Sequence, residues 1–283
     1  MNPEYTTVDG VRIRFRIHRN PGAPKLLLIN SLPQSIRCWD AHWNDLSRSY
    51  ELLAMDMPGF GLSDCRPDML SPSAEAEILG KIIVQFSWQR CIAIGPDIGV
   101  PVVLSLAQNQ PDLVSGIVIF DGPGYYEPVF SVDLRWTMKY RWFRWLGAKT
   151  YKPEVYLKGV FARGYKKFTP PPDVYEEYVA VNSDRGAFER TTAFLATYPK
   201  ELTVIGDALG KITLPVLIVW GEEDVFVPVE NARELARRIP RNKLHIFKGC
   251  GHFSHEDAGD EFTEVLRSWV ASEIPAPPVA RPS

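Results

Sequence analysis

Residues 91–101 read CIAIGPDIGVP. A short apolar run leads into a turn that carries Gly95 and Gly99, and an apolar helical pattern follows. Glycines on both sides of a central residue suit a strand-to-helix corner that is too tight for side chains. The pattern is typical of a nucleophile elbow, with Asp97 where a serine often stands. An ordinary turn fits the same residues, so other parts of the chain have to decide between the two.

Other continuous apolar runs occur along the chain, separated by helical patterns. Ser71 and Pro72 mark the start of one helix, with serine as the N-cap and proline in the first turn. Continuous runs are typical of strands covered on both faces, and strands that alternate with helices predict βαβ units. We therefore expect an α/β fold with a mostly parallel, doubly wound sheet. The expected strands are Lys25–Ile29, Tyr50–Met55, Cys91–Ile94, Val114–Phe120 and Val216–Trp220.

The first twenty residues predict a β-hairpin. Asp9-Gly10 supplies the turn, and residues 11–17 alternate between apolar and basic side chains. The period of two predicts a half-buried strand whose arginines, Arg12, Arg14 and Arg16, form a solvated face.

The alternation of strands and helices stops between about residues 122 and 205. This segment holds nine of the eleven tyrosines and also Trp136, Trp142 and Trp145. It lacks the short apolar runs of the expected strands. We expect a mostly helical cap inserted after the sixth strand, with residues 1–121 and 206–273 forming the core.

Within this segment, residues 134–145 read LRWTMKYRWFRW, which mixes aromatic side chains with four basic ones. A helix lying on a membrane surface has this composition. We favour an amphipathic cap helix whose aromatic face points toward a pocket, because one such helix sits naturally in a cap.

Composition narrows the classes of partner. The chain has 283 residues with 32 Lys+Arg against 34 Asp+Glu, a formal net charge of −2. That balance argues against nucleic acid or an anionic membrane as the main partner, since both require a basic surface. No apolar run is long enough to span a bilayer, and the first residues lack the pattern of a secretory signal. The tail 274–283, IPAPPVARPS, is rich in proline and is expected to be disordered.

The four cysteines, Cys38, Cys65, Cys91 and Cys250, lie far apart and form no metal-ligand spacing. We expect reduced cysteines in a cytoplasmic protein that uses no metal and no cofactor. The expected partner is a small-molecule substrate, and the sequence leaves a homodimer open.

Two later segments join the elbow. Residues 214–228, LPVLIVWGEEDVFVP, predict a buried strand that ends near Asp224, and residues 248–256, KGCGHFSHE, place His252 in a loop before the last helix. A nucleophile, an acid and a histidine in that chain order indicate a catalytic triad. Asp121, at the end of another expected strand, is a rival for the acid, and we favour Asp224.

With these motifs in place, the sequence resembles the α/β-hydrolase superfamily. It is most similar to the branch with an aspartate nucleophile, which includes epoxide hydrolases and haloalkane dehalogenases. The resemblance covers nearly the whole chain, and the choice of branch depends mainly on Asp97. The matching segments are LLLINSLPQS at 26–35, DMPGFGLSD at 56–64, GPDIG at 95–99, GEEDVFVP at 221–228 and GCGHF at 249–253.

The resemblance implies a role for each of these residues. Asp97 would attack an electrophilic carbon and form an ester, and His252, oriented by Asp224, would activate the water that hydrolyses it. The backbone N–H groups of Leu32 and Ile98 would form the oxyanion hole. Asn30-Ser31 stands where the family usually has His-Gly.

The leaving group decides the substrate class. An epoxide leaves an alkoxide that needs a proton, which family members commonly take from cap tyrosines, and Tyr125, Tyr126 and Tyr198 are our candidates because they flank the cap. A halide needs N–H donors, commonly from tryptophan and asparagine. Both groups often carry tryptophan after the nucleophile, where this chain has Ile98. Asn30 and Trp136 complete the candidate substrate contacts.

We therefore expect a hydrolase with a covalent aspartyl-ester intermediate, and above all an epoxide hydrolase for a bulky aromatic or apolar substrate. A dehalogenase is an alternative. A non-hydrolytic isomerase, lyase or cyclase on the same fold is a second, and a ligand-binding receptor is a third.

Overall fold

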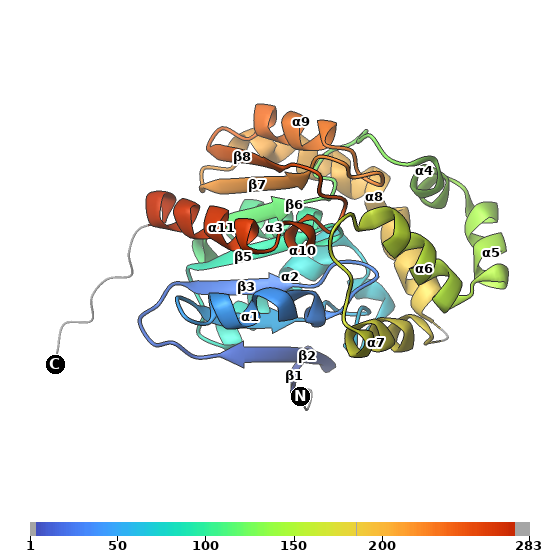
Figure 1. The fold of residues 1–283 in the computed structure, drawn as a ribbon, viewed down its shortest axis with the longest axis horizontal. Coiled ribbons are helices and arrows are strands. Elements are labelled where there is room, and N and C mark those ends of the chain that lie inside the picture. Colours follow the sequence, from blue (N-terminus) through green and yellow to red (C-terminus); the bar gives the residue numbers. More distant parts are fainter. Residues whose placement is uncertain (1–3, 185, 275–283) are drawn as a thin grey trace.

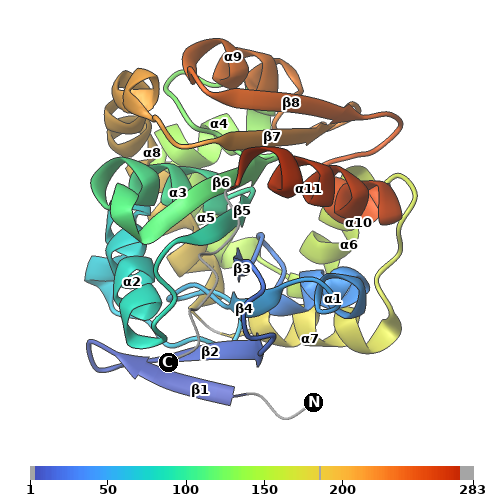
Figure 2. The ribbon, with the colours of Figure 1, turned by 90° about the vertical axis from the view of Figure 1, so that its left-hand side faces the viewer.

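The computed structural model describes residues 4–184 and 186–274. The tail expected to be disordered lies outside the described residues from position 275 onward. The described chain forms one eight-stranded sheet in the order β1-β2-β4-β3-β5-β6-β7-β8. Figure 2 shows the strands stacked in this order from bottom to top. The strands are β1 Glu4–Val8, β2 Val11–His18, β3 Lys25–Ile29, β4 Glu51–Met55, β5 Cys91–Pro96, β6 Val114–Phe120, β7 Val216–Gly221 and β8 Asn242–Phe247.

The sheet confirms the predicted fold class. The strands β3 to β8 pair in parallel, and only the β1–β2 and β2–β4 pairs are antiparallel. The five expected sheet strands and the N-terminal hairpin are all present within a few residues of their predicted ends. The hydrophobic pattern did not predict the edge strand β8, because Asn242, Lys243 and His245 interrupt its apolar residues.

Helices cover both faces of the sheet. One face packs against α2, α3 and α9, and the other against α1 and α11, as two separate clusters of buried side chains. Figure 2 shows α2 and α3 on one side of the sheet and α1 and α11 on the other. Their bounds are α1 Asp40–Leu46, α2 Pro72–Gln85, α3 Gly99–Asn109, α9 Glu230–Arg238, α10 Ser254–Ala258 and α11 Asp260–Glu273.

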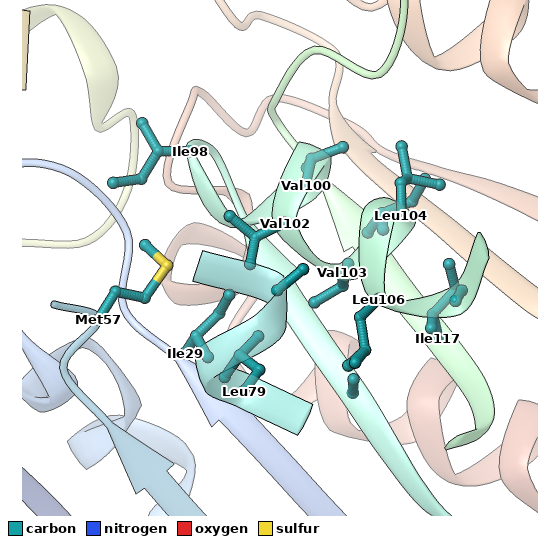
Figure 3. Close-up of a cluster of buried hydrophobic side chains, with 14 of the residues drawn as sticks. Ile29, Met57, Leu79, Ile98, Val100, Val102, Val103, Leu104, Leu106 and Ile117 are labelled. Atoms are coloured by element: carbon teal, nitrogen blue, oxygen red, sulfur yellow. The ribbon is translucent and has the colours of Figure 1, made fainter. Parts of the chain in front are cut away.

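The helix α3, which directly follows the expected elbow, lies in the middle of the first cluster. Its apolar side chains are almost fully buried and meet residues of β3, α2 and β6. Burying one such side chain contributes about 1.5–3 kcal/mol, so this packing holds the start of α3 firmly against the sheet. Figure 3 shows the contact among Ile29, Leu79, Val102, Val103, Leu106 and Ile117.

The N-terminal hairpin departs from the expected solvated arginine face. Asp9 and Gly10 have φ of 50° and 77°, as the predicted tight turn requires. Arg12 is exposed, but Arg14 is only 7% exposed and forms ion pairs with Glu177 and Asp56. The expectation of a solvated face is wrong at Arg14 because Glu177 belongs to a helix that covers this part of the strand.

The described residues between β6 and β7 form five helices: α4 Val132–Lys139, α5 Arg141–Thr150, α6 Pro153–Gly164, α7 Pro172–Asn182 and α8 Ala187–Ala208. In Figure 1 they lie together at the right-hand end of the sheet, with α5 outermost. The expected boundary between residues 205 and 206 falls inside α8, which continues to Ala208. None of the described helices is long and apolar enough to cross a bilayer.

The aromatic residues of α4 and α5 do not point inward as expected. Trp136, Trp142 and Trp145 are 41%, 55% and 60% exposed. The helix α5 instead packs through Gly147, where an added Cβ would lie 2.6 Å from the ring of Phe188 on α8. Helical periodicity indicated an aromatic face, but the close approach at the glycine turns that face outward.

Candidate active site

Asp97 occupies a sharp turn between β5 and α3. Its φ is 49°, in the left-handed region that L-residues rarely adopt. The turn needs glycine at position 95, where an added Cβ would lie 2.5 Å from the backbone oxygen of Gly99. At Gly99 an added Cβ would lie 2.7 Å from Ile29 Cδ1, so that side chain would have to move. This strain and close approach are those of a nucleophile elbow rather than an ordinary turn.

The two carboxylate oxygens of Asp97 have different neighbours. The backbone N–H of Leu32 donates to Oδ2 over 3.0 Å, and the Ser31 hydroxyl lies 3.4 Å from the same oxygen. Oδ1 lies 3.7 Å from His252 Nε2. Ile98, the other predicted donor, follows Asp97 at the start of α3 with helical φ of −62°, and its role stays a prediction.

His252 is held by the acid at the end of β7. Its Nδ1 lies 2.8 Å from Asp224 Oδ2, while Asp224 Oδ1 accepts the backbone N–H groups of Phe226 and Val227. Burial lowers the pKa of His252, but the carboxylates of Asp224 and Asp97 outweigh it and raise that pKa well above 6.5. The arrangement directs Nε2 toward Asp97. Esterification of Asp97 would remove one of the two charges that raise this pKa, which is what a general base at that carboxylate requires.

The rival acid, Asp121, is occupied elsewhere. Its Oδ1 accepts the N–H of Gly221 and its Oδ2 accepts the N–H of Ser254, so it joins the strand that precedes Asp224 to the helix that follows His252. Burial raises the pKa of Asp121 well above its ordinary value, and the nearby charge of Asp224 adds to this. The geometry fits a structural carboxyl group.

A pocket opens above Asp97 and His252. Its volume is about 130 Å³, below the roughly 300–1,000 Å³ typical of ligand pockets. Its wall is mostly apolar, with two tyrosines, three threonines and a second carboxylate at Asp133, and the described lining residues include no Lys or Arg. The inserted helices supply Asp133, Leu134, Thr137, Tyr156, Val160, Asn182, Phe188, Thr191, Thr192 and Leu195, and the α5–α6 turn supplies Tyr151.

Most of the predicted substrate contacts lie away from this pocket. Asn30 is fully buried and orders its own loop, donating to Ser31 O and accepting from Met57 N. Tyr125 donates to Asn231 over 2.9 Å, and Tyr126 and Trp136 line a separate groove. The structure therefore does not bring these four residues to Asp97.

Tyr198 is an intermediate case. It is 2% exposed on α8, one turn beyond the pocket residue Leu195. Its hydroxyl is buried without a hydrogen-bond partner in the described part of the chain. Burial, with the charge of Asp97, raises the pKa of Tyr198 well above 10, so the hydroxyl keeps its proton.

Two tyrosines that were not singled out line the pocket itself. Tyr151 precedes α6 and Tyr156 lies in its first turn, with ring centroids 5.5 Å apart. Burial raises the pKa of Tyr151 to about 12. Tyr156 is 37% exposed, and its partial burial, with Tyr151 and the charge of Asp97, raises its pKa. Both hydroxyls therefore remain proton donors near neutral pH. The sequence offered one signal for them: Pro153 marks the start of a helix, which places Tyr151 just before that helix and Tyr156 in its first turn.

A buried polar cluster supports the site from below. Gln34 Nε2 donates to Tyr165 Oη over 2.8 Å and to Glu256 Oε2 over 2.6 Å, and Tyr165 donates to Glu256 over 2.6 Å. These residues come from the Leu32 loop, the end of the α6 segment and the His252 segment. Burial raises the pKa of Glu256 to about 8, despite its two donors.

Asp257 fixes the α6–α7 connection to the histidine loop. Its two oxygens accept the backbone N–H groups of Lys166, Lys167, Phe168 and Gly251 over 2.8–2.9 Å. His252 N also donates to Gly164 O over 2.8 Å. One side of the pocket roof is thereby tied to the loop that carries His252.

The residues described contain no group of three His, Cys, Asp or Glu side chains placed to hold a metal ion. All four cysteines are free, as expected.

Comparisons with known proteins agree with this architecture. The family model described as alpha/beta hydrolase fold matches residues 24–259. An uncharacterized hydrolase, YugF, of Bacillus subtilis is 24% identical over 93% of this chain and 96% of its own. A 2-hydroxy-6-oxononadienedioate/2-hydroxy-6-oxononatrienedioate hydrolase of Cupriavidus pinatubonensis is 25% identical over 95% of each.

Solved structures of similar fold include proteins with different activities. The epoxide hydrolase CorEH superimposes with a TM-score of 0.82 at 20% identity, covering 95% of this chain and 98% of its own. The haloalkane dehalogenase DbeA of Bradyrhizobium elkani superimposes with a TM-score of 0.81 at 18% identity, covering 95% and 97%. At these identities the likeness is one of fold.

Proposed function

This chain belongs to the α/β-hydrolase fold family and is a hydrolase of that family. On that basis we propose that it opens epoxides through a covalent ester on Asp97. The observation that carries the proposal is the unequal setting of the two carboxylate oxygens. Oδ2 accepts the N–H of Leu32, while Oδ1 lies 3.7 Å from His252 Nε2, and Asp97 lines the pocket. One oxygen is thus placed to attack, and the other to carry the oxyanion of a later step.

The first step is a displacement. Oδ1 of Asp97 bonds to an epoxide carbon, the C–O bond of the ring breaks, and the released alkoxide takes a proton from a pocket tyrosine. An aspartate is an anion near neutral pH and needs no base for this attack. Tyr156 is our leading donor and Tyr151 its partner, because both line the pocket beside Asp97. Tyr198 is a third candidate on account of its buried, unpartnered hydroxyl.

The second step is hydrolysis of the ester. His252 takes a proton from water, and the hydroxide attacks the ester carbon of Asp97. The negative charge gathers on Oδ2, where the Leu32 N–H stabilises it, and we assign the second donor to Ile98. The ester bond breaks and the alkoxide carrying the original Oδ1 takes the second proton of the attacking water, so that a diol leaves and Asp97 is again a carboxylate. The proton on His252 returns to the tyrosinate. Epoxide and water are consumed and a diol is formed.

The pocket favours an epoxide over a halide. Among its described lining residues there is no tryptophan, and its one asparagine, Asn182, donates both N–H groups to Pro33 O and Tyr178 O. A departing halide would therefore lack the N–H donors it needs. The two tyrosines instead suit an alkoxide, which needs a proton.

The pocket also disfavours a dianionic substrate, such as the one in the name of the Cupriavidus relative. It contains the carboxylates of Asp97 and Asp133, and no Lys or Arg stands among its described lining residues. Like charges repel strongly in such a partly enclosed site. The volume of about 130 Å³ favours a compact, uncharged, apolar epoxide over a polycyclic one. On this proposal α4–α8 act as a cap, since they roof the pocket.

Isotope labelling tests the proposal. In a single turnover of styrene oxide in ¹⁸O-water, the diol should be unlabelled and the peptide containing Asp97 should gain the label. His252→Gln should stall hydrolysis, so that intact-protein mass spectrometry shows an adduct of the substrate's mass. Asp97→Ala should form no adduct, and His245→Gln, an exposed histidine outside the site, should behave as wild type.

Solvent ¹⁸O appearing directly in the diol, or near-normal turnover by Asp97→Ala, would contradict covalent catalysis and favour acid–base chemistry at the same site.

Tyr156→Phe should slow alkylation by about 10²–10⁴-fold. Tyr126→Phe, on the separate groove, should have no such effect.

A further inference from the structure

The helices α4 and α5 present an unusual surface. Neither contains a fully buried side chain, although together they carry three of the eight tryptophans. Trp is among the side chains most buried on average, so three exposed ones on adjacent helices call for a covering partner. In Figure 1 the two helices lie at the far right, the α5 end of the molecule. The exposed apolar members are Val132, Trp136, Tyr140, Trp142, Trp145 and Leu146.

The same surface is basic. Residues 132–150 contain five basic residues and one acidic residue, in a chain whose overall net charge is −2. The basic groups lie beside the aromatic rings: Lys149 Nζ is 3.9 Å from the centroid of Trp145, and Lys139 Nζ is 5.6 Å from that of Tyr140. The rest of the protein therefore carries a net negative charge, and the small net charge of the whole chain does not reveal this positively charged face.

We propose that this face of α4 and α5 docks on an anionic lipid bilayer. Tryptophan and tyrosine prefer the boundary between headgroups and acyl chains, and lysine and arginine bind anionic headgroups while their stems lie along apolar surface. Both residue types occur here on the same exposed helices. The two helices lie parallel to the bilayer surface and do not span the bilayer.

Charge argues for a bilayer over a second copy of this chain. In a two-fold symmetric dimer the same patch meets itself, so the basic residues of one copy would face those of the other. An anionic headgroup layer neutralises them instead, and gains about 1 kcal/mol per Lys or Arg near the surface.

The face adjoins the pocket. The helix α4 lines the pocket with Asp133, Leu134 and Thr137, while Val132 and Trp136 of the same helix are exposed. Phe188, which packs on Gly147 of α5, also lines the pocket. A docked protein would hold this wall of its pocket at the bilayer surface, within reach of apolar molecules dissolved there.

Vesicle co-sedimentation of the full chain tests the docking without any assay of activity. The protein should bind phosphatidylcholine vesicles that contain phosphatidylglycerol, bind pure phosphatidylcholine weakly, and dissociate at high salt. Arg141→Gln/Lys149→Gln should weaken binding to the anionic vesicles about thirtyfold. The matched variant Arg233→Gln/Arg237→Gln, which removes two exposed charges from α9, should bind as wild type.

Trp142→Ala/Trp145→Ala should weaken binding to both kinds of vesicle, whereas Val84→Ala/Val204→Ala, at exposed apolar sites elsewhere, should not. Circular dichroism checks that each variant is folded. If the tryptophan variant is not folded, the charge variants still test the proposal. Absence of binding by wild type, or equal loss in the α9 variant, would overturn the proposal. So would a dimer, measured by analytical ultracentrifugation, that the tryptophan variant dissociates.

Discussion

The backbone N–H of Leu32 donates a hydrogen bond to Oδ2 of Asp97 over 3.0 Å. The loop after β3 and the turn after β5 are 65 residues apart in sequence, and the parallel pairing of β3 with β5 brings their carboxyl ends together. The donor is thus held in place by the sheet and does not have to be assembled during the reaction.

Removing that donor should slow the reaction without unfolding the protein. An amide-to-ester replacement at Leu32, made with the α-hydroxy analogue of leucine, should lower the rate of ester hydrolysis about 10²–10³-fold. Ser31→Ala should cost less than about tenfold, since the Ser31 hydroxyl lies at 3.4 Å from the same oxygen. Stopped-flow single turnovers measure both, and an equal loss in the two variants would contradict the assignment.

Asp224 and Asp121 should separate in mutagenesis. Asp224→Asn should lower turnover by about 10⁴-fold, because an amide at this position favours the wrong tautomer of His252. Asp121→Asn should keep most of the turnover per folded molecule, because Asp121 accepts only main-chain N–H groups in the described structure. Steady-state kinetics with active-site titration distinguish them, and the reverse order of effects would make Asp121 the acid.

The two ion pairs that join α7 to the core should differ in strength. Arg14 and Glu177 have side-chain exposures of 8% and 20%, and Ser35 also donates to Glu177. Glu177→Ala leaves Arg14 buried with only Asp56 as a partner, and should cost about 3 kcal/mol of stability. Asp173→Ala breaks an exposed pair with Arg37 and should change the midpoint of urea unfolding far less. Comparable losses would show that burial does not set the strength of this pair.

Stability should fall as the pH rises through the range set by Glu256. Burial raises the pKa of Glu256 from 4.5 to about 8, so the folded state holds this proton after the unfolded chain has lost it. The contribution is complete below pH 4.5 and lost by about pH 8, a change on the order of 4 kcal/mol. Glu256→Gln should flatten urea-unfolding stability across this range, while Glu230→Gln on exposed α9 should not.

The sheet and the elbow could be predicted because their signals are local. The runs Lys25–Ile29 and Val114–Phe120 match β3 and β6 residue for residue, since a strand buried on both faces is apolar at most of its positions. Gly95 and Gly99 mark the elbow because a Cβ at Gly95 would meet backbone atoms and one at Gly99 would displace the Ile29 side chain.

The pocket wall could not be predicted in the same way. Tyr125 and Tyr126 flank the insertion in sequence, but Tyr151 and Tyr156 reach the pocket, because the packing of α4–α8 decides which turn lies over Asp97. The predicted orientation of α5, with its aromatic face toward the pocket, was wrong for a related reason. Periodicity indicates that a helix has an apolar face, but where that face points depends on tertiary contacts such as that of Gly147 with Phe188.

The anchor at Asp257 has a consequence for how new variants of this protein could be built. The carboxylate binds main-chain N–H groups of residues 166–168, so the side chains at these positions can change without loss of the anchor. The other pocket wall, contributed by α4, the α5–α6 turn and α8, lies outside this anchor. A combinatorial library aimed at altered substrate range should therefore randomise that wall, and leave Asp257 and the backbone path through residues 164–168 untouched.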